Sequence, residues 1–371
     1  MTSLFGKQWT REEIQLYVPD LSQLAPIRRS TLREGRAEGI DTVEIATGSG
    51  FQFTVLPGRG MDISHASFRG IPLCWRTYAG DVAAPYYEAP AFGWNRSAFG
   101  GLMSTGGLSA MGSPSTDNGA ELGIHGRIGN IPATNVWADS GWDGDRYRMW
   151  VRGKIAEAEA LGGNQVLTRE ISTELGSSRF TIRDTVENRT HARAEHMMLY
   201  HFNIGFPLLS SQSRLLVDSE KVEPRDTDSR AGLGSWDRFD PPQAGRPHQL
   251  FYHKLRPDAD GRAHVVLAGM PERPEGPLAV YLSYTHDTLP WFVNWKCMSA
   301  GDYVTGIEPA NAWVEGRATE RAAGRLRFLE PWETVHYEVE FGVLSGAAAI
   351  NEFAEAHQLP RYDLALLEAW R

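Results

Sequence analysis

One stretch of the sequence decides the fold class of this chain: residues 146–188, RYRMWVRGKIAEAEALGGNQVLTREISTELGSSRFTIRDTVEN. It consists of runs with alternating apolar and polar residues, and the turn sequences LGG and LGSS separate these runs. In the last run, Phe180, Ile182 and Val186 are apolar among charged or polar neighbours, which is typical of an antiparallel strand with one buried face. The stretch therefore predicts consecutive antiparallel strands.

The same pattern continues outward on both sides of this stretch. Residues 42–57, TVEIATGSGFQFTVLP, form two short alternating runs around GSG, which predicts a hairpin. Further runs lie at 276–285, GPLAVYLSYT, and at 333–344, ETVHYEVEFGVL. Because no helix of the βαβ kind separates these runs, we predict an all-β fold, a large antiparallel β-sandwich.

Helical patterns are confined to the two ends of the chain. Residues 10–17, TREEIQLY, have a threonine cap followed by acidic residues in the first turn. Residues 347–358 and 362–371 also have helical patterns, and Leu359 and Pro360 separate them. We therefore expect short terminal helices at 10–17 and within 347–371.

We expect one domain over residues 1–371, with a core at about 40–345. The segment DPPQAGRP at 240–247 is the best candidate for a linker, but strands resume directly on both sides of it. Large all-β folds of this length often form a single domain.

Composition excludes several classes of protein. The 371 residues are 42% hydrophobic and 22% charged, which is ordinary for a globular protein, and the net charge is −9 without any Lys/Arg-rich run. We therefore expect no nucleic-acid partner. Cys74 and Cys297 are the two cysteines, which suits a reducing compartment. No signal-peptide pattern and no run approaching the ~18 apolar residues of a membrane span is found, so we expect a cytoplasmic protein without a membrane partner.

Four places combine polar functional groups with a strand pattern. In LGIHGRIGNIPA, residues 122–133, glycines on both sides of His125 allow the backbone and a ligand to approach closely. In MMLYHFNIGFPLL, residues 197–209, period-two alternation puts His201 and Asn203 on one face of an otherwise apolar strand. A buried polar pair of this kind needs partners or a ligand.

The other two places lie further along the chain. His253 and Lys254 occur in QLFYHKLRP at 249–257, and Glu308 occurs in TGIEPANAW at 305–313. Glu308 follows a run rich in aromatic residues, so we expect partial desolvation of its carboxylate, which raises a carboxyl pKa and makes a better base. The aromatic residues we expect around it are Trp291, Trp295 and Tyr303.

Tryptophan and tyrosine, twelve of each, suit stacking on sugar rings, although aromatic residues are also common in strands. The sequence contains no HExxH, no CxxC pair, no GxSxG, no P-loop and no GxGxxG after a strand. These absences argue against the common zinc proteases, α/β-hydrolases and nucleotide-binding proteins.

The four places occur in an order that resembles the aldose 1-epimerase (galactose mutarotase) superfamily. The motifs are IHGR at His125, YHFNIG at His201, FYHKL at His253 and GIEPAN at Glu308. The resemblance covers about residues 40–345. It is closest to the uncharacterised aldose-1-epimerase-like branch, because VLPGRGMDIS and FGGLMSTGGLSAMG are similar to that branch.

The resemblance implies a galactose mutarotase-like supersandwich and an isomerase that acts on carbohydrates without a cofactor. It implies that Glu308 is the general base, which removes the O1 proton, and that His201 is the acid, which protonates the ring oxygen. Arg127 stands where the family usually has a second glycine, and His253 stands where it has an aspartate. These two departures point to a non-standard aldose or an acidic aldose derivative rather than to galactose or glucose. The substrate-binding residues we expect are His125, Arg127, Asn203, His253, Arg59, Asp62, Trp295, Lys296 and Asn311.

Two alternatives stay open at this point. His125, His201, His253 and Glu308 could instead bind a divalent metal ion in a metal-dependent sugar isomerase or epimerase. The chain could also be a non-catalytic carbohydrate-binding protein, because one fold supports many functions. In each case we expect a small sugar as the partner, and a monomer or homodimer.

Overall fold

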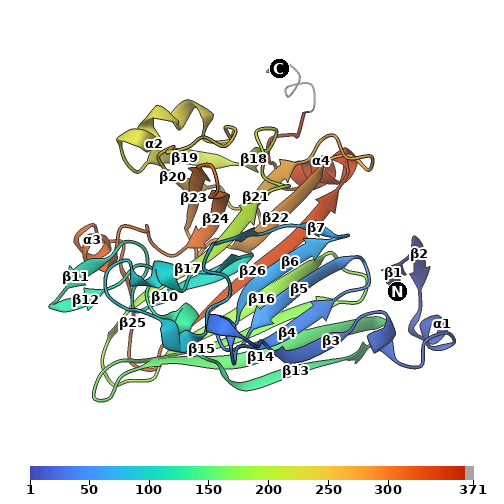
Figure 1. The fold of residues 1–371 in the computed structure, drawn as a ribbon, viewed down its shortest axis with the longest axis horizontal. Helices are drawn as coiled ribbons and strands as arrows, with labels where there is room; N and C mark the ends of the chain where they lie inside the picture. The colour runs from blue at the N-terminus through green and yellow to red at the C-terminus, as the bar shows by residue number, and fades with distance from the viewer. Residues whose placement is uncertain (364–371) are drawn as a thin grey trace.

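Two large sheets make up the fold, and the computed structural model describes residues 1–363 of the chain. Every strand pair in these sheets is antiparallel (Figure 1). The first sheet has twelve strands. Its strands follow the order β19 (Ser219–Pro224), β20 (Gln249–Leu255), β23 (Trp291–Met298), β24 (Tyr303–Ala310), β17 (Ala194–Gly205), β10 (Met103–Leu108), β6 (Asp62–Phe68), β5 (Phe51–Leu56), β4 (Asp41–Ala46) and β3 (Ile27–Thr31), while β25 (Arg327–Leu329) pairs with β17 and β7 (Ile71–Pro72) pairs with β6.

The second sheet has eight strands and contains the stretch that decided the fold class. Three consecutive strands lie within that stretch and pair as neighbours, as the sequence predicts. The order is β13 (Thr134–Asp143), β14 (Arg146–Ala158), β15 (Asn164–Glu174), β16 (Arg179–Asn188), β26 (Thr334–Ser345), β22 (Leu278–Thr285), β21 (Arg262–Gly269) and β18 (Arg214–Val217).

Aromatic side chains from both sheets meet in the core between them. Phe53 of the first sheet packs on Phe180 of the second, with ring centroids 4.8 Å apart. Phe202 stacks on Phe341 at 5.6 Å in the same way. Because inward-facing residues of both sheets share one hydrophobic core, the predicted β-sandwich is confirmed.

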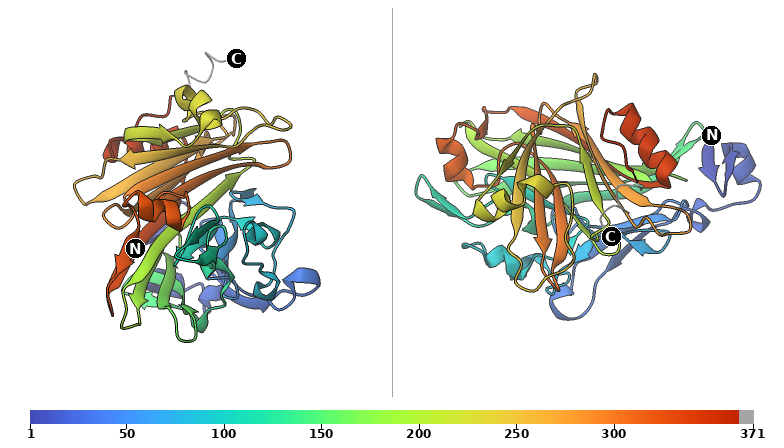
Figure 2. Two further views of the ribbon diagram at one scale, coloured as in Figure 1. Left: turned by 90° about the vertical axis from the view of Figure 1, so that its left-hand side faces the viewer. Right: turned by 90° about the horizontal axis from the view of Figure 1, so that it is seen from above.

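Short elements connect and flank the two sheets. In Figure 2, right, the N-terminal elements β1, β2 and α1 lie at one side of the molecule. Three two-stranded sheets are formed by β1 (Thr2–Leu4) with β2 (Lys7–Trp9), β8 (Trp75–Arg76) with β9 (Gly100–Gly101), and β11 (Ser115–Asp117) with β12 (Ala120–Leu122). The helices are α1 (Arg11–Gln15), α2 (Thr227–Ala231), α3 (Arg317–Ala322) and α4 (Ala347–Ala356), with 3-10 turns at Leu21–Gln23, Gly35–Ala37, Ala84–Tyr86, Gly93–Arg96, Ile128–Asn130 and Leu233–Ser235.

The terminal helices can be compared with the sequence prediction. Thr10 caps α1 in a capping box with Glu13, which explains why the helix starts there. The pattern at 347–358 corresponds to α4. The pattern at 362–371 lies outside the described residues beyond Asp363. Among residues 1–363, no helix is long and apolar enough to cross a membrane.

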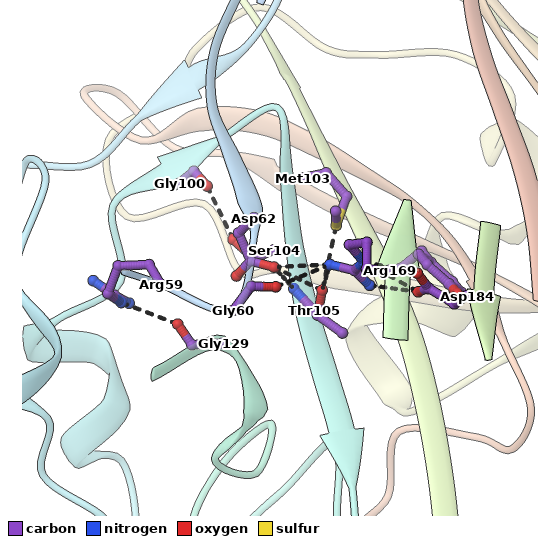
Figure 3. A network of polar contacts seen from close by, with 11 residues as sticks. Arg59, Gly60, Asp62, Gly100, Met103, Ser104, Thr105, Gly129, Arg169 and Asp184 are labelled. Atoms are coloured by element: carbon purple, nitrogen blue, oxygen red, sulfur yellow. Dashed lines mark hydrogen bonds and ion pairs between the residues drawn. The ribbon is translucent and has the colours of Figure 1, made fainter. Parts of the chain in front are cut away.

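A buried polar network joins the two sheets (Figure 3). Arg169 on β15 donates hydrogen bonds to both carboxylate oxygens of Asp184 on β16, at 3.0 Å from Nε to Oδ1 and 2.7 Å from Nη2 to Oδ2. Its Nη1 also donates to Thr105 Oγ1 on β10 at 2.8 Å. Tyr200 on β17 donates its hydroxyl to Asp184 at 2.7 Å. The network therefore fixes strands β10 and β17 of the first sheet against the second sheet.

Candidate active site

A cavity of about 610 Å³ lies on the face of the first sheet that points away from the sandwich core. Alternation along β17 explains this placement, because Tyr200 and Phe202 enter the core while His201 and Asn203 line the cavity. Strands β10, β24, β23 and β20 each contribute lining residues, and the segment between β8 and β9 adds Trp94. This volume falls in the range of ligand pockets.

Glu308 and His201 face each other in this cavity. The antiparallel pairing of β17 with β24 brings them together, and Glu308 Oε1 lies 3.2 Å from His201 Nε2. Glu308 is only 2% exposed, and the His201 side chain is 13% exposed. The structure therefore brings together the two residues for which the family resemblance implies acid–base roles.

Gly306 makes room for the Glu308 carboxylate. The two residues lie on the same face of β24, because they are two positions apart. A Cβ atom at position 306 would lie 2.0 Å from Glu308 Oε1 and 3.2 Å from His201 Cε1. A side chain at this position would therefore displace the carboxylate from His201.

His125 approaches the pair from the loop before the Ile128–Asn130 turn. Its ring lies 5.5 Å from the His201 ring, edge to face, and 5.0 Å from the Trp94 ring. His125 has a φ of 58°, which is uncommon for a residue with a side chain and is a form of strain found at functional sites. Gly126 follows with a φ of 72°, and a Cβ there would lie 2.1 Å from the Ala110 carbonyl oxygen.

Burial controls the protonation of these three groups. Desolvation raises the pKa of Glu308 well above the ordinary carboxyl value. Desolvation, with a further contribution from His125, lowers the pKa of His201 to about 3. Desolvation, with a contribution from Arg225, lowers the pKa of His125 to about 4. Both imidazoles are therefore neutral near pH 7, and the buried pair favours its uncharged form.

Several buried polar atoms of the cavity lining have no hydrogen-bond partner among the described residues, although one of them, Glu308 Oε1, contacts His201 Nε2 at 3.2 Å. They are Nδ1 of His125, Nδ1 of His201, Oε1 of Glu308 and Nε1 of Trp75. Buried polar atoms are usually hydrogen-bonded, and such a concentration in one cavity indicates that a polar ligand or water completes the site.

The structure brings together five of the eleven predicted site residues. These five line the cavity: His125, His201, Asn203, Trp295 and Glu308. The other six do not line it: Arg59, Asp62, Arg127, His253, Lys296 and Asn311.

Arg127 and His253 were expected to contact the sugar, and the structure places both elsewhere. Arg127 pairs with Glu159 at 3.6 Å on the surface. His253 is fully buried, its Nδ1 lies 2.8 Å from Ser219 Oγ, and it packs between the rings of Trp236 and Phe292. It is three positions from Leu250, which lines the cavity, so it points to the opposite face of β20.

Lys296 and Asn311 have structural partners. Lys296 follows Trp295 on β23 and therefore points to the other face, where its Nζ donates to the carbonyls of Ser235 and Arg238. The Asn311 amide accepts from the Met198 backbone at 2.8 Å and donates to the His196 carbonyl.

Arg59 and Asp62 support the framework behind the cavity. Arg59 donates to the backbone carbonyls of Gly129, Val82 and Ser97, and it is 2% exposed. Asp62 accepts hydrogen bonds from the backbone and hydroxyl of Thr105, at 3.0 and 2.6 Å, beside the Arg169 network (Figure 3). Since Ser104 next to Thr105 lines the cavity, Asp62 acts on the site through strand β10.

The expected aromatic surroundings of Glu308 are also only partly correct. Trp295 lines the cavity, but Trp291 packs on Trp313 at 5.6 Å and Tyr303 donates its hydroxyl to the Asp240 carbonyl at 2.6 Å. The aromatic wall comes instead from segments far away in sequence. The lining residues that the sequence did not single out include Trp75, Trp94, Ser104, Arg225, His248 and Asp302.

The four residues considered as metal ligands do not meet at one point, because His253 lies on the core side of β20. Among the described residues, the only group of three donors with suitable spacing is Asp258, His264 and His357, in a different hollow. The rings of His264 and His357 stack 3.7 Å apart with an interplanar angle of 25°. Nearly parallel rings do not direct their nitrogen lone pairs toward one ion.

A family model described as "Domain of unknown function (DUF4432)" matches residues 37–343. No curated protein matches the chain. Among solved structures, a candidate aldose 1-epimerase from Klebsiella pneumoniae is similar at 22% identity, with a TM-score of 0.83 over 89% of this chain and 86% of that one.

Two further structures are more distant in sequence. A galactose mutarotase-like protein from Clostridium acetobutylicum has 15% identity and a TM-score of 0.58, covering 87% of this chain and 99% of that one. A galactose 1-epimerase from Lactobacillus acidophilus has 11% identity and a TM-score of 0.55 over 87% and 99% of the two chains. At these identities the similarity establishes the fold alone. The resemblance to the aldose 1-epimerase superfamily is therefore confirmed for the fold.

Proposed function

The chain belongs to the DUF4432 family, and we propose that it is a carbohydrate isomerase that interconverts the anomers of an aldose. The observation that carries this proposal is the Glu308–His201 contact of 3.2 Å in a cavity with an aromatic wall. A carboxyl group and a neutral imidazole in contact are the acid–base equipment that ring opening at an anomeric carbon requires.

In the proposed reaction, ionised Glu308 accepts the proton of the sugar O1 while the bond between C1 and the ring oxygen breaks. That proton passes across the 3.2 Å contact to the neutral imidazole of His201, which delivers it to the ring oxygen. The pair is then back in its starting state, and rotation about the C1–C2 bond followed by the same transfers in reverse gives the other anomer. His125 is positioned to orient O1 or the ring oxygen.

We propose an uncharged aldose as the substrate. The expectation of an acidic sugar rested on Arg127 and His253, and neither lines the cavity. Arg225 does line it, but its Nε lies 2.9 Å from Glu315 and its Nη2 donates to Ser113 at 2.8 Å. Its charge is therefore already balanced, and Glu308, His201 and His125 favour their neutral forms.

The experiment is NMR measurement of α–β anomer exchange with the pure protein. We expect exchange above the spontaneous rate for neutral aldoses such as glucose and galactose, and much less for the matching uronates. No acceleration for any aldose would contradict the isomerase and leave a non-catalytic sugar-binding protein. Loss of exchange with a chelator, and its rescue by a divalent ion, would instead support the metal-dependent alternative.

A further inference from the structure

Helix α4 packs on the outer face of the second sheet. Alternation along β21 sends Val265 and Leu267 into the sandwich core, so Val266 and Ala268 face outward. Ile350 of α4 is fully buried on this outward side, in a small hydrophobic cluster separate from the sandwich core. The helix therefore covers an apolar strip that the core between the sheets does not use.

The C-terminal end of α4 is joined to β21 by two stacked imidazoles. His357 is the C-cap residue of α4, and its ring lies 3.7 Å from the ring of His264 on β21, with an interplanar angle of 25°. His264 lies two positions from Val266, on the same outward face, and is 4% exposed. Phe353, one turn earlier in α4, packs on His357 with ring centroids 4.5 Å apart. The stack therefore connects the end of a helix to a buried position in a strand.

One carboxylate serves both imidazoles. Asp258 Oδ2 lies 2.8 Å from His264 Nε2 and 3.8 Å from His357 Nδ1. Because an ionised carboxylate only accepts hydrogen bonds, neutral His264 carries its proton on Nε2. Its Nδ1 is buried and has no hydrogen-bond partner among the described residues. A first added proton therefore leaves the cluster with no net charge, whereas a second produces two stacked cations beside a single carboxylate.

The surrounding charges offer little to a second cation. Arg262 on β21 adds a positive charge, and its Nη1 donates to Glu338 at 2.8 Å. Glu340 on β26 lies 3.7 Å from Arg179 and is therefore already paired. Burial is the main cause that lowers the pKa values of both His264 and His357 below 6.5, and Arg262 lowers them further. Besides the cluster itself, the charged side chains that line this hollow are Arg146, Glu174, Arg179, Asp260, Arg262 and Glu340, while Glu352 and Glu355 of α4 are exposed.

We propose that Asp258, His264 and His357 form a proton-operated latch on the C-terminal end of α4. The latch is closed when at most one imidazole is charged, and a second proton drives the two rings apart. His264 is fixed by the pairing of β21 with its neighbouring strands, so His357 is the ring that moves. Opening releases residues 357–363 and uncovers part of the apolar strip. This inference does not depend on the proposed function.

The direction of the pH response follows from the form that binds the second proton. In the closed form that proton meets a stacked cation, whereas in the open form the released His357 titrates near its ordinary pKa of 6.5. The open form therefore binds more protons below pH 6.5, and the closed form loses stability as pH falls. For one linked proton, the equilibrium constant for opening rises by up to about tenfold per pH unit.

Hydrogen exchange of the wild-type protein, followed by mass spectrometry, tests the latch. The reporting amides are those of His357, Leu359 and Tyr362, which donate hydrogen bonds to groups of α4. After correction for intrinsic exchange rates, we expect their protection to fall at least about tenfold from pH 7 to pH 5. Amides of β16 should keep their protection and serve as the internal reference. Constant protection at the end of α4, or an equal fall in β16, would overturn the latch.

Substitutions of His357 separate the effect of the proton from that of the ring stack. His357→Phe keeps a flat ring against His264 and Phe353 but binds no proton, so protection in this variant should change less than about twofold between pH 7 and pH 5. His357→Ala lacks the ring and should have lower protection than wild type at pH 7. His336→Phe is the matched control, because His336 is exposed on β26 and contacts Thr185, and it should retain the wild-type response. A wild-type pH response in folded His357→Phe would contradict the latch.

Discussion

At the scale of single residues, the environment of Glu308 decides its chemistry. Burial raises the pKa of Glu308, and neither neighbouring imidazole compensates as a cation, because burial holds both His201 and His125 neutral. The carboxylate is therefore a strong base when it forms, but it forms only at a pH above the usual carboxyl range. Hydroxyls of a bound sugar that donate to the carboxylate would help it to ionise.

This environment predicts a pH dependence for the exchange reaction. We expect kcat/KM to rise with pH through the raised pKa of Glu308, since the free enzyme must lose that proton before Glu308 can accept one from O1. His201 and His125 have pKa values of about 3 and 4, so neither should add a step near neutrality. A pH profile of anomer exchange, corrected for the spontaneous rate, checks this. A rate that falls as pH rises through neutrality would show that protonated Glu308 is the active form.

Gly306 supplies a second prediction at this scale. Gly306→Ala should lower kcat by at least about 10²-fold, the lower end of what general-base catalysis contributes, because the new Cβ displaces the Glu308 carboxylate. Gly141→Ala is the control, since a Cβ at that position meets nothing within 4 Å. Exchange rates of both variants, measured with circular dichroism as a folding check, give the answer. Wild-type activity in a folded Gly306→Ala would mean that the carboxylate need not occupy this position.

At the scale of strands, period-two alternation explains both the correct and the wrong predictions. Alternation along β17 correctly put His201 and Asn203 on one face. The same rule, applied to β23, would have separated Lys296 from Trp295. On β20 the rule alone does not say which face His253 occupies. It needs one residue, such as Leu250, that is already known to face the cavity.

Other parts of the site depend on contacts that strand patterns do not contain. Trp75, Trp94 and His248 reach the cavity from connecting segments, whose positions are set by packing rather than by periodicity. The Arg169–Asp184 ion pair could have been predicted from the sequence, because the two residues lie directly opposite each other in the hairpin that LGSS closes. Finding it would have required committing to the register of that hairpin.

The same pair predicts a difference in stability between two arginines on neighbouring strands. Arg169→Met should lower the free energy of unfolding by about 3–5 kcal/mol, because it leaves Asp184 buried without its charged partner. Arg183→Met should cost at most about 1 kcal/mol, since Arg183 pairs with Glu338 on the surface. Urea unfolding followed by tryptophan fluorescence measures both values. Equal effects of the two substitutions would contradict the role of the network in joining the sheets.

At the scale of the whole molecule, the sandwich buries several imidazoles in neutral form. The pKa of His125 is lowered to about 4, and the pKa values of His196, His201 and His253 are lowered to about 3, with desolvation as the main cause in each. The unfolded chain binds protons at these histidines near the ordinary pKa of 6.5, whereas the folded chain does not.

Stability should therefore decrease as pH falls from about 6.5 toward 3–4, by up to about 1.4 kcal/mol per pH unit for each such histidine. Urea unfolding at a series of pH values checks the slope. His253→Phe, which removes one of these groups away from the cavity, should make the slope shallower by about one proton. Stability that stays constant from pH 6.5 to 4 would contradict the neutral buried state of these side chains.

The most direct test of the central claim is α–β anomer exchange of glucose, measured by NMR for wild type and Glu308→Gln under identical conditions. Glutamine preserves the size of the side chain but cannot accept the O1 proton, so the account predicts a loss of about 10²–10⁴-fold in kcat with sugar binding largely retained. Exchange by Glu308→Gln at the wild-type rate would contradict the account, because Glu308 would then have no part in the reaction.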